Sequence, residues 1–175
     1  MEADHLRLDT GRRDAMLRRL GFDKPPETSL DGLSRLYRGW LRTVPFCGSR
    51  KRRYYGVDPE RAGPLPVMTA PDFVDAFLAE GAGGTCFPTA EALYQMLRAC
   101  GFKARRAIGS MLDFPQIPGP NHGTVVVAFD GRDYLVDPFF GSIDPLPLDG
   151  SARESGPAHV AIRVEPADGA GDMPV

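Results

Sequence analysis

The residue best suited to chemistry in this chain is a cysteine at the start of an apolar, helix-forming segment. Gly83-Gly84-Thr85-Cys86-Phe87 leads into the run Ala90–Leu97. A cysteine in the first turn of a helix lies beside unpaired backbone N–H groups and the positive end of the helix dipole, and both favour the thiolate. His122 and Asp137 follow, beside strand-like segments. A nucleophile, a base and an orienting carboxylate are the parts needed for acyl transfer through a thiol.

A predicted hairpin tests whether the histidine and the aspartate can meet. Asp130-Gly131 lies between two apolar runs, and this dipeptide favours a two-residue turn between antiparallel strands. With that turn Thr124 lies opposite Asp137, and His122 lies two residues further along the same face, about 7–8 Å away between backbones. A three-residue turn would put the two side chains on opposite faces. The spacing therefore predicts a His–Asp pair for the two-residue register.

The elements that must position these residues are helical first and extended later. Helices are expected from Asp9 or Thr10 to Gly21, from Thr28 or Ser29 to Pro45, from Pro71 to Gly81 and from Thr85 to Gly101. Residues 46–68, rich in Gly, Pro and Arg, are expected to form an irregular connection. Strands are predicted at 104–112, 123–129 and 133–137, with weaker candidates at 142–148 and 159–164.

This order predicts an α+β fold, an N-terminal helical bundle followed by an antiparallel β-sheet or barrel. We expect a helical domain at residues 1–101 that carries the cysteine helix, and a β domain at 102–165 that carries His122 and Asp137. Residues 166–175 have few apolar side chains to bury and are expected to fray.

Composition excludes several classes of protein. A hydrophobic fraction of 42% is too high for a disordered chain, and a net charge of −2 gives no reason to expect nucleic acid or an anionic membrane as a partner. No run is long enough to span a bilayer, and the N-terminus is too charged for a signal peptide. Three cysteines without metal-ligand spacing indicate a reducing compartment, so a cytoplasmic protein without a bound metal is expected.

Each candidate also has a purely structural interpretation. Cys100 lies in the apolar stripe of its helix and is expected to be a small buried residue, and Cys47 is expected to be incidental. His122 could simply begin a strand, and Asp137, before Pro138, could only form a turn. His5 and His159 are weaker candidates for the base. The basic run 50–53 is expected to be a solvated loop, with phosphate binding as the alternative.

The order of the motifs resembles the arylamine N-acetyltransferase family. That family has a Val-Pro-Phe segment, an Arg-Gly-Gly-x-Cys-Phe motif that opens a helix, a Gly-Phe after that helix, and a Tyr-Leu-Val-Asp-x-x-Phe-Gly signature. The corresponding segments here are Val44–Phe46, Ala82–Phe87, Gly101-Phe102 and Tyr134–Gly141. His122 begins a strand as in the family, and Pro-Leu-Pro-Leu at 145–148 also fits. The likeness extends from about residue 16 to residue 148.

The resemblance implies a cysteine-protease-like (transglutaminase-like) core and a ping-pong reaction. Cys86 would take an acetyl or other acyl group from coenzyme A, with acetyl-CoA as co-substrate, and pass it to an arylamine, an arylhydrazine or a related nucleophile. His122 would accept the thiol proton, and Asp137 would fix the tautomer of the ring. By family position Phe46 and Phe140 would line the acceptor pocket, and Asn121 would lie beside the base. The two phenylalanines could instead be ordinary core residues.

The chain also departs from the family pattern. Ala82 replaces the arginine of the motif, Pro88 replaces an acidic residue, and Ala90 replaces an asparagine. The family continues into a third, lid-like domain that this sequence lacks, so a shortened relative or a fragment is expected. The alternatives are a macrolactam-forming amide synthase of the same family, a transglutaminase-like or papain-like thiol hydrolase, and a degenerate relative without catalytic activity.

Overall fold

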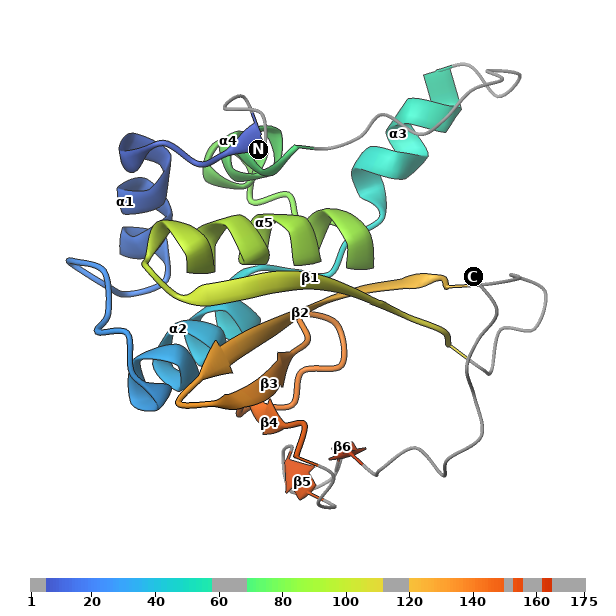
Figure 1. The fold of residues 1–175 in the computed structure, drawn as a ribbon. Helices are drawn as coiled ribbons and strands as arrows, with labels where there is room; N and C mark the ends of the chain where they lie inside the picture. The colour runs from blue at the N-terminus through green and yellow to red at the C-terminus, as the bar shows by residue number, and fades with distance from the viewer. Residues whose placement is uncertain (1–5, 58–68, 112–119, 150–152, 156–161, 165–175) are drawn as a thin grey trace.

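A computed structural model describes residues 6–57, 69–111, 120–149, 153–155 and 162–164. The described part contains five helices, four of which pack together, and two small sheets (Figure 1). The helices are α1 (Thr10–Arg19), α2 (Leu30–Thr43), α3 (Ser49–Val57), α4 (Ala70–Glu80) and α5 (Cys86–Ala99). The strands are β1 (Lys103–Gly109), β2 (His122–Phe129), β3 (Arg132–Val136), β4 (Leu146–Pro147), β5 (Arg153–Ser155) and β6 (Ile162–Val164).

Three helices begin at polar capping residues, of which Asp9 and Ser29 are predicted by the sequence. The side chains of Asp9, Ser29 and Thr69 each accept a hydrogen bond from a backbone N–H in the first turn of α1, α2 and α4. At the other end of α4, Gly81 adopts φ +68°, the left-handed conformation that commonly ends a helix. The predictions for these three helices are confirmed.

Helix α3 corrects the prediction of an irregular connection over residues 46–68 and of a loop at the basic run 50–53; residues 58–68 lie outside the described residues. Its residues Ser49–Val57 contain no proline, and arginine and lysine are good helix formers. The prolines that suggested a loop all lie after residue 57. The error came from treating the whole stretch as one segment, since a short helix without an apolar stripe leaves no periodic signal.

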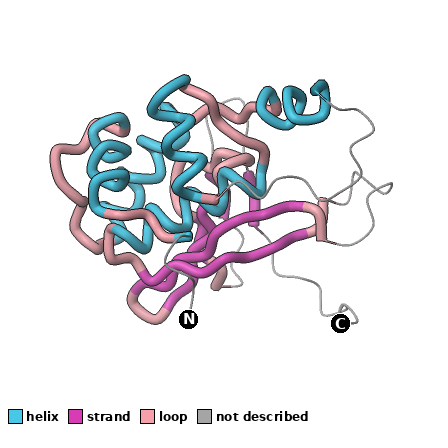
Figure 2. Tube along the Cα trace, turned by 90° about the horizontal axis from the view of Figure 1, so that it is seen from above, coloured by secondary structure: helices cyan, strands magenta, loops and turns pink. Residues whose placement is uncertain are grey.

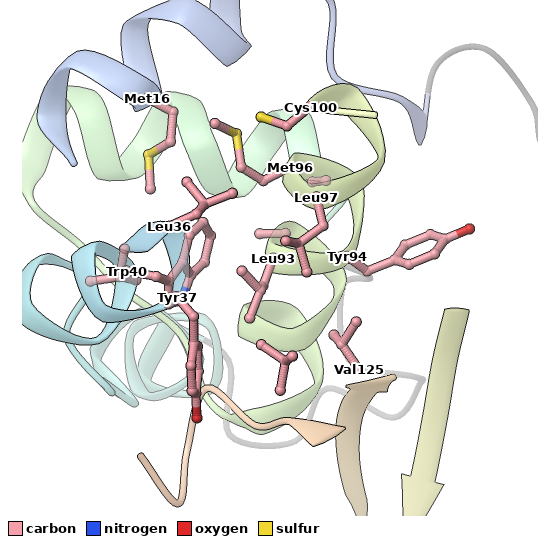
Figure 3. Close-up of a cluster of buried hydrophobic side chains, with 14 of the residues drawn as sticks. Met16, Leu36, Tyr37, Trp40, Leu93, Tyr94, Met96, Leu97, Cys100 and Val125 are labelled. Carbon is pink, nitrogen blue, oxygen red and sulfur yellow. The ribbon is translucent and has the colours of Figure 1, made fainter. Parts of the chain in front are cut away.

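Helix α5 forms the centre of the core. Its residues Leu93, Met96 and Leu97 are fully buried, and Figure 3 shows them facing Leu36, Tyr37 and Trp40 of α2. Contacts with β1 and β2 on one side and with α4 on the other place the helix between the sheet and the other helices. The position of its first residue, Cys86, is therefore fixed by packing along the whole helix.

The main sheet is antiparallel, in the order β1-β2-β3-β4. The turn between β2 and β3 has the predicted two residues, with Phe129 paired to Arg132. Asp130 and Gly131 both have positive φ, 50° and 74°, as a type I′ turn requires. The predicted register is therefore confirmed. Strands β5 and β6 form a separate pair; β5 was not predicted, and most of the candidate strand at 159–164 lies outside the described residues.

The helices gather on one side of the main sheet, as Figure 2 shows from above, so the α+β prediction is confirmed. One apolar cluster includes residues of both the helices and the strands, for example Leu93 and Val125. The boundary between a helical domain at 1–101 and a β domain at 102–165 stays a prediction. The tail at 166–175 lies outside the described residues. Within the described ranges, no helix is both long and apolar enough to cross a membrane.

Candidate active site

The loop before Cys86 is held tightly against the end of α2. Phe46 and Gly84 form a parallel β-bridge, and the Cys47 N–H donates to the Gly84 carbonyl at 3.0 Å. A Cβ atom on Gly83 would lie 1.7 Å from the Pro45 carbonyl oxygen, so only glycine fits there. Thr85 occupies the N-cap position without a side-chain capping bond. The two glycines thus let the backbone approach α2 closely and fix where Cys86 begins α5.

His122 and Asp137 form a close, buried pair. Nε2 of His122 lies 2.6 Å from Oδ2 of Asp137, and the two residues are 4% and 2% exposed. His122 begins β2 and Asp137 directly follows β3, as the two-residue hairpin places them. Since Nε2 contacts the carboxylate, Nδ1 is the nitrogen left for another group; it is buried and makes no hydrogen bond of standard geometry with the described residues.

The second oxygen of the Asp137 carboxylate organises the turn that follows β3. Oδ1 accepts hydrogen bonds from the N–H groups of Phe139 and Phe140, at 2.8 and 2.9 Å. These bonds hold the carboxylate orientation and satisfy the oxygen that does not face the histidine. Asp137 therefore does form the turn that was considered as its purely structural role, and the same side chain also contacts His122.

The start of β2 packs directly against the start of α5, which brings Cys86 beside His122. Gly123 makes this approach feasible, because a Cβ atom there would lie 2.7 Å from Cδ1 and 3.1 Å from Cα of Phe87. Both His122 and the N–H of Gly123 act on the Cys86 thiol, as does the N–H of Phe87. The three predicted residues Cys86, His122 and Asp137 therefore lie together.

The three ionisable groups shift one another toward a charged state. Partial burial alone would raise the pKa of the Cys86 thiol, but the His122 ring and the nearby N–H groups outweigh it, so the pKa falls below its ordinary value. The Asp137 carboxylate, followed by the Cys86 thiol, raises the pKa of His122 to about 9. Burial opposes the charge on Asp137, yet hydrogen bonding with His122 and the Phe140 N–H lowers its pKa. This arrangement favours a thiolate beside an imidazolium.

Aromatic side chains surround the histidine and are open to solvent. Phe46 and Phe140 are 52% and 48% exposed, so neither is a core residue. The Phe140 ring lies 5.0 Å from the His122 ring between centroids. The Phe139 ring lies between those of Phe46 and His122, with centroid distances of 4.6 Å to Phe46 and 5.6 Å to His122. Sequence reasoning missed Phe139; the only signal was its place in the turn after Asp137.

The other candidates have local partners. Oδ1 of Asn121 accepts from the Met111 N–H at 2.7 Å, so its amide oxygen joins the ends of β1 and β2 next to His122. Cys100 is buried, as expected, and Cys47 is half-buried with its thiol beside the Ser49 hydroxyl. His5 and His159 lie outside the described residues. Among the described residues no group of three His, Cys, Asp or Glu side chains is arranged to hold a metal ion.

A family model described as N-acetyltransferase matches residues 29–170, which is most of the chain. The chain belongs to the arylamine N-acetyltransferase family. A curated arylamine N-acetyltransferase from Mycolicibacterium smegmatis is 28% identical over 131 residues, covering 71% of this chain and 45% of that protein. The resemblance drawn from the motifs is therefore confirmed.

Solved arylamine N-acetyltransferases share the fold. The enzyme from Bacillus cereus has a TM-score of 0.72 at 18% identity, covering 89% of this chain and 59% of that one. Arylamine N-acetyltransferase C from Bacillus anthracis has a TM-score of 0.65 at 21% identity, covering 85% and 57%. The chain thus spans between two fifths and three fifths of the length of these relatives, and the cysteine-protease-like core is confirmed.

The departures from the family motif lie in the loop and first turn around Cys86. Ala82 and Pro88 are half-buried and Ala90 is buried. If the missing arginine and acidic residue form a pair in other members, the chain has lost both partners together, so neither charge is left buried and unmatched. His122 and the Gly123 N–H lower the pKa of the Cys86 thiol without them.

Proposed function

We propose that this protein transfers an acetyl or other acyl group from coenzyme A to an arylamine, an arylhydrazine or a related nitrogen nucleophile. The observation that supports it is the buried 2.6 Å contact between His122 and Asp137 beside a half-exposed thiol of lowered pKa. We infer the roles of nucleophile for Cys86, base for His122 and orienting carboxylate for Asp137. The relatives named above are arylamine N-acetyltransferases, which supports the same reaction class.

In the first half-reaction the Cys86 thiolate attacks the carbonyl carbon of the thioester. The bond from that carbon to the sulfur of coenzyme A breaks, and the leaving thiolate takes the proton from the His122 imidazolium. Backbone N–H groups near Cys86 stabilise the negative oxygen formed on attack. The products are free coenzyme A and a thioester on Cys86, with His122 now neutral.

In the second half-reaction the amine nitrogen attacks the thioester on Cys86. The neutral His122 ring accepts the proton of the attacking nitrogen, and the carbon–sulfur bond breaks to return the Cys86 thiolate. Asp137 holds the ring through Nε2 and stabilises its positive charge. The enzyme returns to the thiolate–imidazolium state in which it began.

The acceptor would lie against the exposed aromatic rings beside His122. Phe46, Phe139 and Phe140 present apolar surface and ring faces to solvent on this side of the site. A planar aromatic amine stacks favourably on such rings, which offer no charge for a charged acceptor to pair with. We assign all three to the acceptor site, with Asn121 holding the adjoining strand ends. A reducing compartment such as the cytoplasm would keep the thiol active.

The test is intact mass after incubation with acetyl-CoA. We expect a gain of one acetyl group on Cys86, loss of that group when an arylamine is added, and no gain for Cys86→Ser. S-acetyl-N-acetylcysteamine, a thioester without the nucleotide, is run in parallel, because it separates acyl transfer from recognition of coenzyme A. Failure of both donors, or an acetyl group that no amine removes, would contradict the proposal.

Other substrates and reagents separate the other candidate reactions. Preference for large acyl thioesters that close on their own amine would indicate an amide synthase. Cleavage of peptide substrates without any thioester would indicate a thiol hydrolase. A Cys86 that resists iodoacetamide at neutral pH would indicate a relative without catalysis.

A further inference from the structure

A buried hydroxyl from α2 contacts the backbone of the aspartate. Tyr37 is fully buried, and its hydroxyl donates a hydrogen bond to the Asp137 carbonyl oxygen at 2.7 Å. It also lies 3.1 Å from Oγ of Ser142, which donates to the Asp144 carbonyl at 2.8 Å. Figure 3 shows the phenol oxygen at the end of the side chain that points out of the apolar cluster. Burial raises the pKa of Tyr37 to about 12, so the hydroxyl keeps its proton at working pH.

Among the described residues, the other contacts of Asp137 are with its own hairpin or with the turn that follows it. His122, Phe139 and Phe140 contact the carboxylate, and Gly141 donates to the carbonyl only at 3.4 Å. Tyr37, one hundred residues away in sequence, is the contact that comes from the helices. Because Cys86 also belongs to a helix, this bond connects the part of the fold that carries the nucleophile to the part that carries the base and the carboxylate.

Helix α2 in fact reaches both parts of the site. Tyr37 near its middle contacts Asp137, and the segment after its end pairs with the loop before Cys86 through the Phe46–Gly84 bridge. Fully buried Trp40, one turn further along α2, stacks with Phe73 of α4 and holds the helix in place. A rigid helix with a contact at each side of a site can fix the distance between them.

We propose that Tyr37 is a positioning residue for the reaction, whose hydroxyl sets the place of the Asp137–His122 pair relative to Cys86. It touches neither the thiol nor the acyl group and acts through the Asp137 backbone. Without the hydroxyl the carbonyl loses its only short hydrogen bond among the described residues, and the turn is free to move away from α2. The His122 ring then lies further from the thiol, and the thiolate loses part of its stabilisation.

The experiment is Tyr37→Phe in the full chain, which removes one oxygen and keeps the ring in the core. The rate of iodoacetamide labelling of Cys86 is measured against pH by peptide mass. We expect the midpoint to move to higher pH and the rate at neutral pH to fall about threefold to tenfold. In the acyl-transfer assay kcat should fall by a similar factor with KM nearly unchanged, since no substrate contact is lost.

Two matched variants accompany it. Tyr94→Phe removes a hydroxyl that contacts Arg98 on the far part of α5, and it should leave the labelling profile unchanged. Ser142→Ala removes the second contact of the Tyr37 hydroxyl and should shift the midpoint in the same direction by a smaller amount. It also tests the proposal if Tyr37→Phe does not fold.

A purely structural role gives a different result. Tyr37→Phe would then lower the melting temperature and leave the labelling midpoint and kcat of the folded fraction as in the wild type, which would overturn the proposal. The kinetic part rests on the proposed function, but labelling needs no acyl donor. A wild-type protein that accepts no acetyl group would therefore contradict the proposed function and leave the test of Tyr37 intact.

Discussion

The two cysteines of α5 lie at opposite ends of one helix and differ in chemistry. Cys86 is the first residue of the helix, half-buried, with a pKa below its ordinary value. Cys100 is the C-cap, 7% exposed, and burial raises its pKa to about 11. Burial acts to raise the pKa of both thiols, so burial cannot account for the lowered pKa of Cys86.

The difference comes from what each end of the helix faces. Cys86 faces His122 and the N–H groups of Phe87 and Gly123, which favour a negative sulfur. Cys100 lies in the apolar cluster, with Arg13 and Asp14 acting on it in opposite directions. The partners of each sulfur therefore set the direction of its pKa shift, and the other end of the same helix provides an internal control.

Replacing each cysteine by serine should give the largest difference in activity between the two ends of α5. We expect Cys86→Ser to lower acyl transfer by on the order of 10³-fold or more, because an alcohol is not ionised by this site. Cys100→Ser should keep activity within about twofold and lower the free energy of unfolding by about 1–2 kcal/mol, since it buries a hydroxyl. Steady-state kinetics and denaturant unfolding measure both. Equal losses of activity in Cys86→Ser and Cys100→Ser would contradict the difference drawn between the two cysteines.

Removing the His122 imidazole should shift the pKa of the Cys86 thiol in the direction seen at Cys100. In His122→Gln the burial of Cys86 remains while its main stabilising partner is gone, so the thiol pKa should rise. We expect acyl transfer to fall by about 10²- to 10⁴-fold, with labelling of Cys86 moving to alkaline pH. An unchanged labelling profile would show that the helix terminus alone sets the thiol pKa.

An alanine at Gly123, where β2 approaches α5 closely, should lower activity, whereas an alanine at Gly109 should not. A methyl group at Gly123 meets the Phe87 ring and backbone, whereas one at Gly109 meets nothing within 4 Å. Gly123→Ala should therefore move His122 away from Cys86 and lower kcat about 10- to 100-fold. Gly109→Ala, on the strand paired with His122, should stay within about twofold. If both variants kept full activity, the approach would not be needed for the site.

The smallest effect concerns stability against pH. Asp137, followed by Cys86, raises the pKa of His122 from 6.5 to about 9 in the folded protein. The stabilisation is therefore fully present below pH 6.5 and is lost as the pH rises through about 9. The lowered pKa of Asp137 has the opposite sense, and its stabilisation is lost as the pH falls below its ordinary value of 3.8. Denaturant unfolding of wild type and His122→Gln from pH 6 to 10 should show the difference between their free energies of unfolding shrinking from about pH 6.5 and nearly lost above pH 9. A constant difference would contradict the pKa shift.

Local signals in the sequence predicted the parts of the fold that local chemistry determines. Capping residues located α1 and α2, Pro71 located the start of α4, and Asp130-Gly131 set the register that brings His122 to Asp137. Helix α3 was missed because its residues 49–57 present no apolar stripe. An element was predicted correctly where the residues that determine it lie within a few positions of one another and leave a recognisable pattern.

Contacts between distant segments were beyond such reasoning. Nothing local in the sequence shows that the Tyr37 hydroxyl meets the backbone of Asp137. The exposure of Phe139 depends on the turn that the Asp137 carboxylate forms, so its place beside His122 could not be derived from composition. The close approach at Gly123 likewise depends on how β2 packs on α5.

The most direct test of the account labels both ends of α5 in one sample. Native protein is treated with iodoacetamide over a range of pH, and the labelling rates of Cys86 and Cys100 are read separately by peptide mass. We expect Cys86 to react at neutral pH with a midpoint below the ordinary thiol value of 9.0, and Cys100 to stay unlabelled until the protein unfolds or the pH approaches 11. A midpoint for Cys86 at or above 9.0, or equal rates at the two cysteines, would contradict the claim that His122 and Asp137 keep this sulfur ionised.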